Sequence, residues 1–361
     1  MALSSNVLSP PPPLPSCLLT TSDGDSSSSS CCSISAVHPD ILLAHILPRL
    51  DGPTLAAAAC ATTELNLLAS HEDLWTELCR STWPSTEEQR LRQIISTFPD
   101  GPRSFFYDSF PLLSNMDPTA ASIRCPADPN RPSELVSAVD IYYRNKLIFT
   151  KVLETETLSA WFRYSPFRID MLDPKDTCPT PIQQPQTEEG CRQVAEELTL
   201  SWILIDPGVP RAMNLSSHRP VLVQRHWLSG EVHARFEAIV GGGERGSSSE
   251  KVGFGMVVTC GGGAQGRGMH VREVSLQAED MDGMISNGKD SLGILERAFE
   301  GKKGIRGRSG EEGKRRHHMF QEMKRERKER KLRREDTLDM LCVAFGVLSL
   351  LVSLGVFFLH R

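Results

Sequence analysis

Apolar residues between positions 37 and 80 recur at helical spacing, in short runs with breaks between them. The first run opens at Pro39, which fits the first turn of a helix. The turn at 51–53 then starts a second helix made of small residues, and Thr62 or Thr63 can cap a third. The pattern therefore predicts three short helices in this part of the chain.

A unit of this size buries little apolar surface. Three short helices in about 45 residues make a very small core, and surface-to-volume scaling makes such a unit marginally stable on its own. Apolar side chains that stay uncovered mark a contact surface for another protein. We therefore expect a partner to complete this segment.

From residue 134 onwards the pattern changes from helical spacing to extended runs. Between 231 and 240, apolar and polar residues alternate as in a half-buried strand, and Ser229-Gly230 before them is a tight-turn signal. A second hairpin is predicted around 144–146, and further strand-like runs cover 198–205, 251–260 and 269–277. Strands without intervening amphipathic helices predict an antiparallel sheet or sandwich rather than a βαβ fold.

The last apolar run, MLCVAFGVLSLLVSLGVFFL at 340–359, carries no charge. A helix of twenty residues is about 30 Å long, which matches the hydrocarbon core of a bilayer. The alternative is a buried globular helix, but such a helix would normally carry a polar stripe, and Ser349 and Ser353 do not make one. The run predicts a transmembrane helix that anchors the chain by its tail.

The net charge of −5 is the sum of an acidic body and a basic tail. Residues 301–336 contain 15 Lys and Arg against 7 Asp and Glu, a local charge of +8 that leaves −13 for the rest of the chain. Because basic residues flank the cytosolic end of a span, the body is expected in the cytosol. The short end after the span favours the endoplasmic reticulum.

The basic tail itself has two interpretations. We expect a juxtamembrane helix that attracts anionic membrane lipid and contains the ion pairs Glu326–Arg330 and Glu329–Arg333. The alternative is a nuclear-localisation or nucleic-acid patch, which the interleaved glutamates disfavour, and no nucleic-acid partner is expected.

The sequence offers no convincing catalytic or metal-binding constellation. Ten cysteines without repeated Cys-x-x-Cys spacing argue against a disulfide scaffold or a zinc-ribbon array, and they indicate reduced thiols. The glycines at 261–266 match a dinucleotide fingerprint, but a strand is predicted after them instead of the required helix. His317 and His318 read as solvated rather than metal-binding. We expect no catalytic residue, no cofactor and no metal.

The segment 37–80 resembles the F-box family. The matching residues are His38-Pro39-Asp40-Ile41-Leu42, Ile46-Leu47-Pro48-Arg49-Leu50, Leu55, a small-residue stretch ending at Cys60, and Leu74-Trp75. The family usually opens with Leu-Pro, and here the leucine is replaced by His38. The alternative is an unrelated helical hairpin.

The chain beyond this segment resembles a plant group of F-box proteins. The similarity is carried by Trp83-Pro84-Ser85, Phe98-Pro99 and 103–111, and more loosely by 137–143 and 202–207. It covers roughly residues 37–240 of the chain.

The resemblance implies a role in protein ubiquitination. F-box segments dock on the Skp-type adaptor of an SCF-type, cullin–RING ubiquitin ligase, and the rest of the chain selects the substrate. Carried over by position, the adaptor contact would come from Pro39, Ile41, Leu42, Ile46, Leu50 and Leu55, while Trp75 would close the small core. The chain would be a non-catalytic subunit that reaches the cullin through the adaptor. The alternative function is a lectin-like or scaffold protein at a membrane, with no ligase role.

The fold class predicted from these patterns is α+β. The expected order is a disordered segment (1–35), the F-box (36–80), a linker with short helices (81–133), a β-rich substrate-recognition region (134–300), a basic juxtamembrane segment (301–336) and a transmembrane tail anchor (337–361). The strand order has a distant likeness to phloem-lectin domains, but the sequence contains no specific sugar-binding motif.

Overall fold

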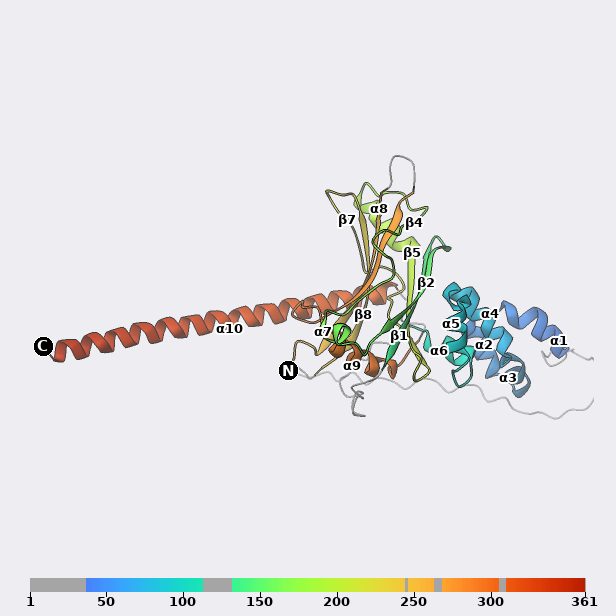
Figure 1. Cartoon of the computed structure of the whole chain (residues 1–361), viewed down its shortest axis with the longest axis horizontal. Coiled ribbons are helices and arrows are strands. Elements are labelled where there is room, and N and C mark those ends of the chain that lie inside the picture. Colours follow the sequence, from blue (N-terminus) through green and yellow to red (C-terminus); the bar gives the residue numbers. More distant parts are fainter. Residues whose placement is uncertain (1–36, 113–131, 244–245, 263–267, 305–309, 361) are drawn as a thin grey trace, which may run out of the picture.

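The structure is a computed structural model that describes residues 37–112, 132–243, 246–262, 268–304 and 310–360. Along the described chain, N-terminal helices are followed by two antiparallel sheets and a long C-terminal helix (Figure 1). This is the predicted α+β class. The segment predicted to be disordered, 1–35, and the glycines at 263–266 lie outside the described residues.

Short helical elements build the N-terminal part. They are α1 (Pro39–Ile41), η2 (Leu42–Ile46), η3 (Leu47–Arg49), α2 (Gly52–Ala59), α3 (Thr63–Ala69), α4 (Glu72–Thr82), η4 (Pro84–Glu87), α5 (Gln89–Ile95) and α6 (Pro102–Asp108). Asp51 caps α2 by accepting a hydrogen bond from the Thr54 N–H at 3.0 Å, and Thr62 caps α3 in the same way. The third predicted helix is in fact two, α3 and α4.

The segment after residue 80 forms short helices, and these helices are packed into the core. Trp83, Leu91 and Phe105 are fully buried, and they belong to the same hydrophobic cluster as Leu55 and Trp75. The helical part of the protein therefore continues to the end of α6.

The strands form two antiparallel sheets. The first has the order β2-β1-β5-β6, with β1 (Glu134–Tyr143), β2 (Lys146–Glu156), β5 (Leu198–Asp206) and β6 (Arg211–Asn214). The second has the order β3-β10-β9-β8-β7, and β4 also pairs with β10; its members are β3 (Arg168–Asp170), β4 (Cys178–Pro179), β7 (Leu222–Arg225), β8 (Val232–Gly241), β9 (Lys251–Gly261) and β10 (His270–Glu279).

Both predicted hairpins are present. The β1–β2 hairpin turns at Arg144 and Asn145, whose φ angles are +53° and +60°, the left-handed geometry that suits the twist of a two-residue hairpin. The β7–β8 hairpin turns through Gly230, which has a φ of +71°. The turn residues had therefore marked the hairpins correctly.

Two helices interrupt the strands, α7 (Ala160–Tyr164) and α8 (Glu188–Glu197), and a third, α9 (Gly288–Phe299), follows the last strand. The prediction that amphipathic helices are absent from this region is therefore wrong. Leu295 and Phe299 of α9 lie four residues apart on one face and are buried in the core that the two sheets share.

The first sheet is buried on both faces. Val139 and Ile141 of β1 belong to the core shared with the second sheet, whereas Val136 and Ala138 pack against the N-terminal helices. Successive side chains of a strand point to opposite faces, so one strand serves both cores. The first sheet is thus a central layer between the helices and the second sheet.

The C-terminal helix α10 (Gly310–Leu359) contains 50 residues and projects away from the body (Figure 1). Gly313 and Phe320, near its start, are buried against the body. An apolar window of 18 residues in this helix has a mean hydropathy of 2.6, and none of that window is buried within the chain. By length and composition, α10 is a candidate for crossing a membrane.

Candidate adaptor-binding surface

Four of the six predicted adaptor contacts are accessible at the start of the helical part. Pro39, Ile41 and Ile46 are exposed, with 49% of the Ile41 surface and 38% of the Ile46 surface open to solvent, and Leu50 is half-buried. The turn η2 is π-helical, since the N–H of Leu47 bonds to the carbonyl five residues earlier. A π turn brings residues five apart nearer to one side than an α-helix does, which favours a common strip for Ile41 and Ile46.

The other two predicted contacts lie inside the molecule. Leu42 and Leu55 are fully buried in the hydrophobic cluster below the strip. In this chain they shape the surface from beneath, and a partner could reach them only after rearrangement. The adaptor role of the accessible four stays a prediction.

A hollow lies beside this strip, between η2–η3 and α4. Its volume is about 490 Å³, and its apolar lining includes Leu43, Leu74 and Leu78. Asp73 and Glu77 add carboxylates to the same lining. The hollow can accept apolar side chains of a partner, and its carboxylates favour a partner that also carries basic groups.

An aromatic cluster supports the helices from below. Trp75 is buried and donates its indole N–H to the Ala69 carbonyl at 2.7 Å. The ring of Phe106 lies 5.6 Å from that of Trp75 and 5.2 Å from that of Trp83, centroid to centroid. Such edge-to-face and tilted pairs add stability beyond their burial. Trp75 therefore lies in the core, where the sequence had placed it.

Trp83 and Ser85 join these helices to the first sheet. The Trp83 indole N–H donates to the Ser201 hydroxyl on β5 at 3.2 Å. The Ser85 backbone N–H and hydroxyl donate to the two oxygens of Asp140 on β1, at 3.0 and 2.6 Å. Thr150 on β2 donates to the same carboxylate at 2.7 Å. Three neighbouring strands are thereby fixed to one short segment.

Asp140 is the charged centre of this junction. Its side chain is fully buried, and burial raises its pKa above the ordinary value, against the opposing effect of the hydrogen bonds from Ser85 and Thr150. The resemblance includes Ser85 and Asp140 but implies no role for either. The sequence does contain a signal, which is that Asp140 lies within the apolar run 135–141. A carboxylate buried with such a run needs hydrogen-bond donors from elsewhere in the fold.

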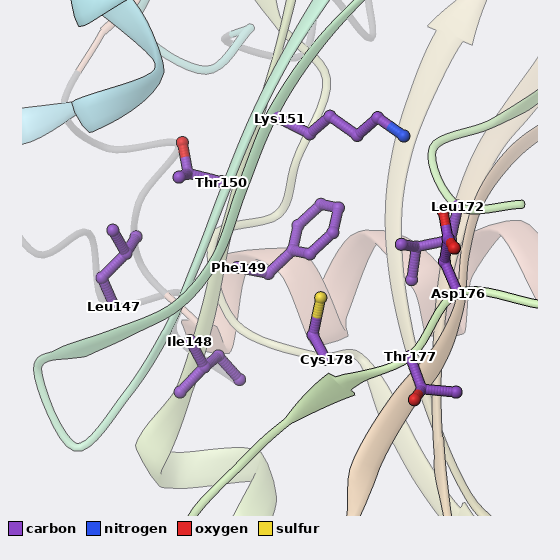
Figure 2. A pocket seen from close by; sticks show the side chains of 9 residues that line it. All are labelled: Leu147, Ile148, Phe149, Thr150, Lys151, Leu172, Asp176, Thr177 and Cys178. Atoms are coloured by element: carbon purple, nitrogen blue, oxygen red, sulfur yellow. The ribbon is translucent and has the colours of Figure 1, made fainter.

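A second hollow opens in the β-rich part, with a volume of about 480 Å³. Figure 2 shows Phe149 and Lys151 of β2 pointing into it and Thr150 pointing the other way, while Leu172 and Cys178 approach from the opposite wall. Among the described residues, no three His, Cys, Asp or Glu side chains are placed to hold a metal ion.

The basic tail contacts the body, which the sequence did not predict. His317 pairs with the buried carboxylate of Glu237 on β8, so the prediction that His317 is solvated is wrong; its neighbour His318 is exposed. Lys324 pairs with Glu279 at the end of β10. The start of α10 is therefore part of the folded body.

Of the two ion pairs predicted within the tail, one forms. Glu329 and Arg333 approach to 3.9 Å. Arg330 instead donates to the backbone carbonyl of Glu326 at 3.4 Å, which leaves the Glu326 carboxylate out of the predicted pair.

Three curated proteins of Arabidopsis thaliana match nearly the whole chain. The probable F-box protein At2g36090 is 49% identical over 330 residues, which cover 91% of this chain and 94% of the relative. F-box protein At3g44326 is 42% identical over 89% of this chain and 88% of its own length, and F-box protein At2g27310 is 40% identical over 91% and 97%.

No protein-family model matches the chain, and no solved structure matches it. The similarity to the three relatives extends far beyond residues 37–80, because it covers about nine-tenths of the chain. The chain belongs to the plant F-box protein family.

Proposed function

We propose that this chain is the substrate-receptor subunit of an SCF-type, cullin–RING ubiquitin ligase. The observation that carries the proposal is the exposed pair Ile41 and Ile46 on the helical segment whose pattern is that of an F-box. Uncovered apolar side chains among polar ones mark a protein contact. A Skp-type adaptor would cover this pair, and the cullin would join through the adaptor.

The junction at Asp140 supports the receptor role. A receptor contributes proximity, since the transfer chemistry belongs to other subunits. Proximity is most useful when the adaptor-binding and target-binding parts are held in one geometry. The hydrogen bonds from Ser85 to Asp140 and from Trp83 to Ser201 hold the helices on the β-rich part, to which we assign target binding.

We also propose that α10 tethers the ligase to a membrane. Its residues 340–359 are uncharged and exposed, and their length suits a single span. The basic tail before them supports a cytosolic body, and we favour the endoplasmic reticulum as the membrane. Tethering would raise the effective concentration of the ligase toward targets in the same membrane.

The adaptor contact is tested with Ile41→Asp combined with Ile46→Asp in the full chain. Both side chains are exposed, so the double variant should fold, and the fraction of chain that recovers adaptor and cullin should fall at least tenfold, roughly 1.4 kcal/mol. Trp161→Asp, an apolar-to-acidic change at a still more exposed position on α7, is the control and should leave recovery unchanged.

Adaptor recovery by the double variant at the level of the parent chain would overturn the contact. If no cullin is recovered with the parent either, and the full-length double variant binds glycans, the lectin-like function is the correct one.

A further inference from the structure

The start of α10 is clamped onto the outer face of the second sheet by a regular seam. The residues that face the body are spaced four, three, four and three apart, which is the spacing of one helix face. They are Gly313 against Ser217, His317 on Glu237, Phe320 over Gly253, Lys324 on Glu279, and Arg327 on Asp282. The seam crosses β8 and β9 and ends beyond β10, so it fixes the direction of the helix as well as its position.

Beyond the seam, the helix continues without a break into the apolar run. Sharp kinks are almost always caused by proline or a comparable interruption, and no proline occurs between Gly310 and Leu359. The thirteen residues from Arg327 to Met340 rise by about 20 Å. With the apolar run in a bilayer, the seam would therefore hold the body at a set height above it.

The helix side of this gap is charged in two bands. The three residues Glu335, Asp336 and Asp339 form an acidic collar next to the apolar run, and 328–334 form a basic band with five Lys and Arg against one Glu. Both bands are exposed. Because the collar separates the basic band from the bilayer, the band is better placed for an acidic polypeptide than for anionic headgroups.

The body side of the gap carries exposed apolar side chains. Met284 is 67% exposed on the loop that also carries Asp282, the body residue paired with Arg327 at the end of the seam. On the adjoining helix α7, Trp161 is 83% and Tyr164 75% exposed. The segment that follows α7 is joined to this loop by a hydrogen bond of 2.8 Å from the Phe167 N–H to the Ser286 carbonyl. Exposed aromatic and aliphatic side chains thus gather where α10 leaves the body.

We propose that the slot between the body and the bilayer binds the juxtamembrane segment of an integral membrane protein, and that this protein is the target of the ligase. The headgroup layer takes about 5–8 Å of the gap, which leaves about 12–15 Å, enough for one helix with its side chains, which is about 10–12 Å wide. Apolar residues of the segment would contact Trp161, Tyr164 and Met284, and acidic residues would meet the basic band. The inference rests on the proposed membrane-anchored receptor.

The test uses the full chain and a single-span probe protein in phosphatidylcholine vesicles. The cytosolic juxtamembrane segment of the probe is rich in Leu and Glu, and a second probe has Lys in place of each Glu. Energy transfer between labelled chain and probe should report an apparent affinity about tenfold higher for the acidic probe. Trp161→Asp with Tyr164→Asp should abolish that preference. Trp227→Asp with Leu228→Asp, an exposed pair on the β7–β8 hairpin, should not.

The rigidity of the helix between the body and the apolar run is tested by inserting a flexible four-residue linker of Gly and Ser after Asp336. The insertion should also abolish the preference for the acidic probe, while the chain stays in the membrane. Equal transfer to the two probes would overturn the proposal. So would efficient reaction of a photo-cross-linker at position 164 with lipid in probe-free vesicles, because the bilayer would then fill the slot. Adaptor recovery and membrane retention of each variant separate loss of the slot from failure of the proposed function.

Discussion

Ser85 holds Asp140 with two hydrogen bonds, one from its backbone N–H at 3.0 Å and one from its hydroxyl at 2.6 Å. This pair joins the segment that follows α4 to the central strand of the first sheet. The helical part and the β-rich part, which the sequence presented as modules separated by a linker, are therefore packed directly against each other.

Replacing Asp140 by alanine should destabilise the protein strongly. The change leaves the N–H and hydroxyl of Ser85 and the hydroxyl of Thr150 without their acceptor in a buried site, at an expected cost of about 3 kcal/mol. Asp140→Asn keeps the shape and one acceptor oxygen, so it should cost clearly less. Urea unfolding of both variants measures the difference, and equal costs would contradict the assigned role of the carboxylate.

The pH dependence of stability gives a second readout of Asp140. Burial raises its pKa in the folded protein above the ordinary value of 3.8. At pH values between the ordinary pKa and the raised pKa, folding is therefore accompanied by the uptake of a proton. The contribution of Asp140 to stability should therefore fall as the pH rises through that range. Asn does not titrate, and the free energy of unfolding of Asp140→Asn should improve relative to the parent as the pH rises. Parallel pH profiles of the two proteins would refute this.

Trp83→Ala should loosen the helices from the sheet. The indole is fully buried against Phe105 and Phe106 and bonds to Ser201, so truncation should cost about 3–5 kcal/mol. Thermal unfolding and limited proteolysis measure the effect. Trp227→Ala, at a tryptophan on the exposed hairpin tip, is the matched control and should change neither measurement.

Gly253→Val should displace the start of α10. A Cβ at this position would lie 3.0 Å from the ring of Phe320 and 2.9 Å from a carboxylate oxygen of Glu237, so the larger side chain must push the helix away. Hydrogen exchange of 310–327 should become faster in this variant. Gly293→Ala on α9 meets no atom within 4 Å, and it should leave that exchange unchanged and add about 0.5–1 kcal/mol of stability. Unaltered protection in Gly253→Val would show that the ring does not hold the helix.

Arginines in the apolar run should release the chain from membranes. Leu348→Arg with Leu351→Arg places two charges near the middle of the run. Each charge raises the free energy of membrane insertion by about 2.5–3.5 kcal/mol. Fractionation should then move the protein from the membrane pellet to the soluble fraction. Leu222→Arg with Leu228→Arg, at exposed positions of the body, should leave it in the pellet. A parent chain found wholly in the soluble fraction would reject the tether.

The strands and their turns could be predicted because half-buried strands alternate and tight turns need residues such as Ser-Gly. Helix α9 was missed, although Asn287 at its start was a usable signal: its side chain accepts the Asp290 N–H at 2.8 Å, as an N-cap does. Short apolar runs that mix with polar residues fit more than one kind of element, and long-range packing decides between them.

The partners of the charges could not be predicted. In the alternating run of β8, Glu237 stands at a solvent-facing position, but a helix 80 residues later covers that face and brings His317 to it. Contact residues that are carried over from the F-box family by position have a similar limitation. The family pattern assigns Leu42 and Ile46 the same role as adaptor contacts. Only the packing shows that Leu42 lies in the core and Ile46 on the surface.

Because both faces of the first sheet are buried, the sheet determines which truncated forms of this protein can stay folded. A chain ending at residue 112 would lack Val136, Ala138 and Ile203, which cover the inner side of its helices, and the uncovered surface would make such a truncation prone to aggregation. It would be a poor dominant-negative decoy for the adaptor. An effective decoy should retain both sheets and stop ahead of the apolar run.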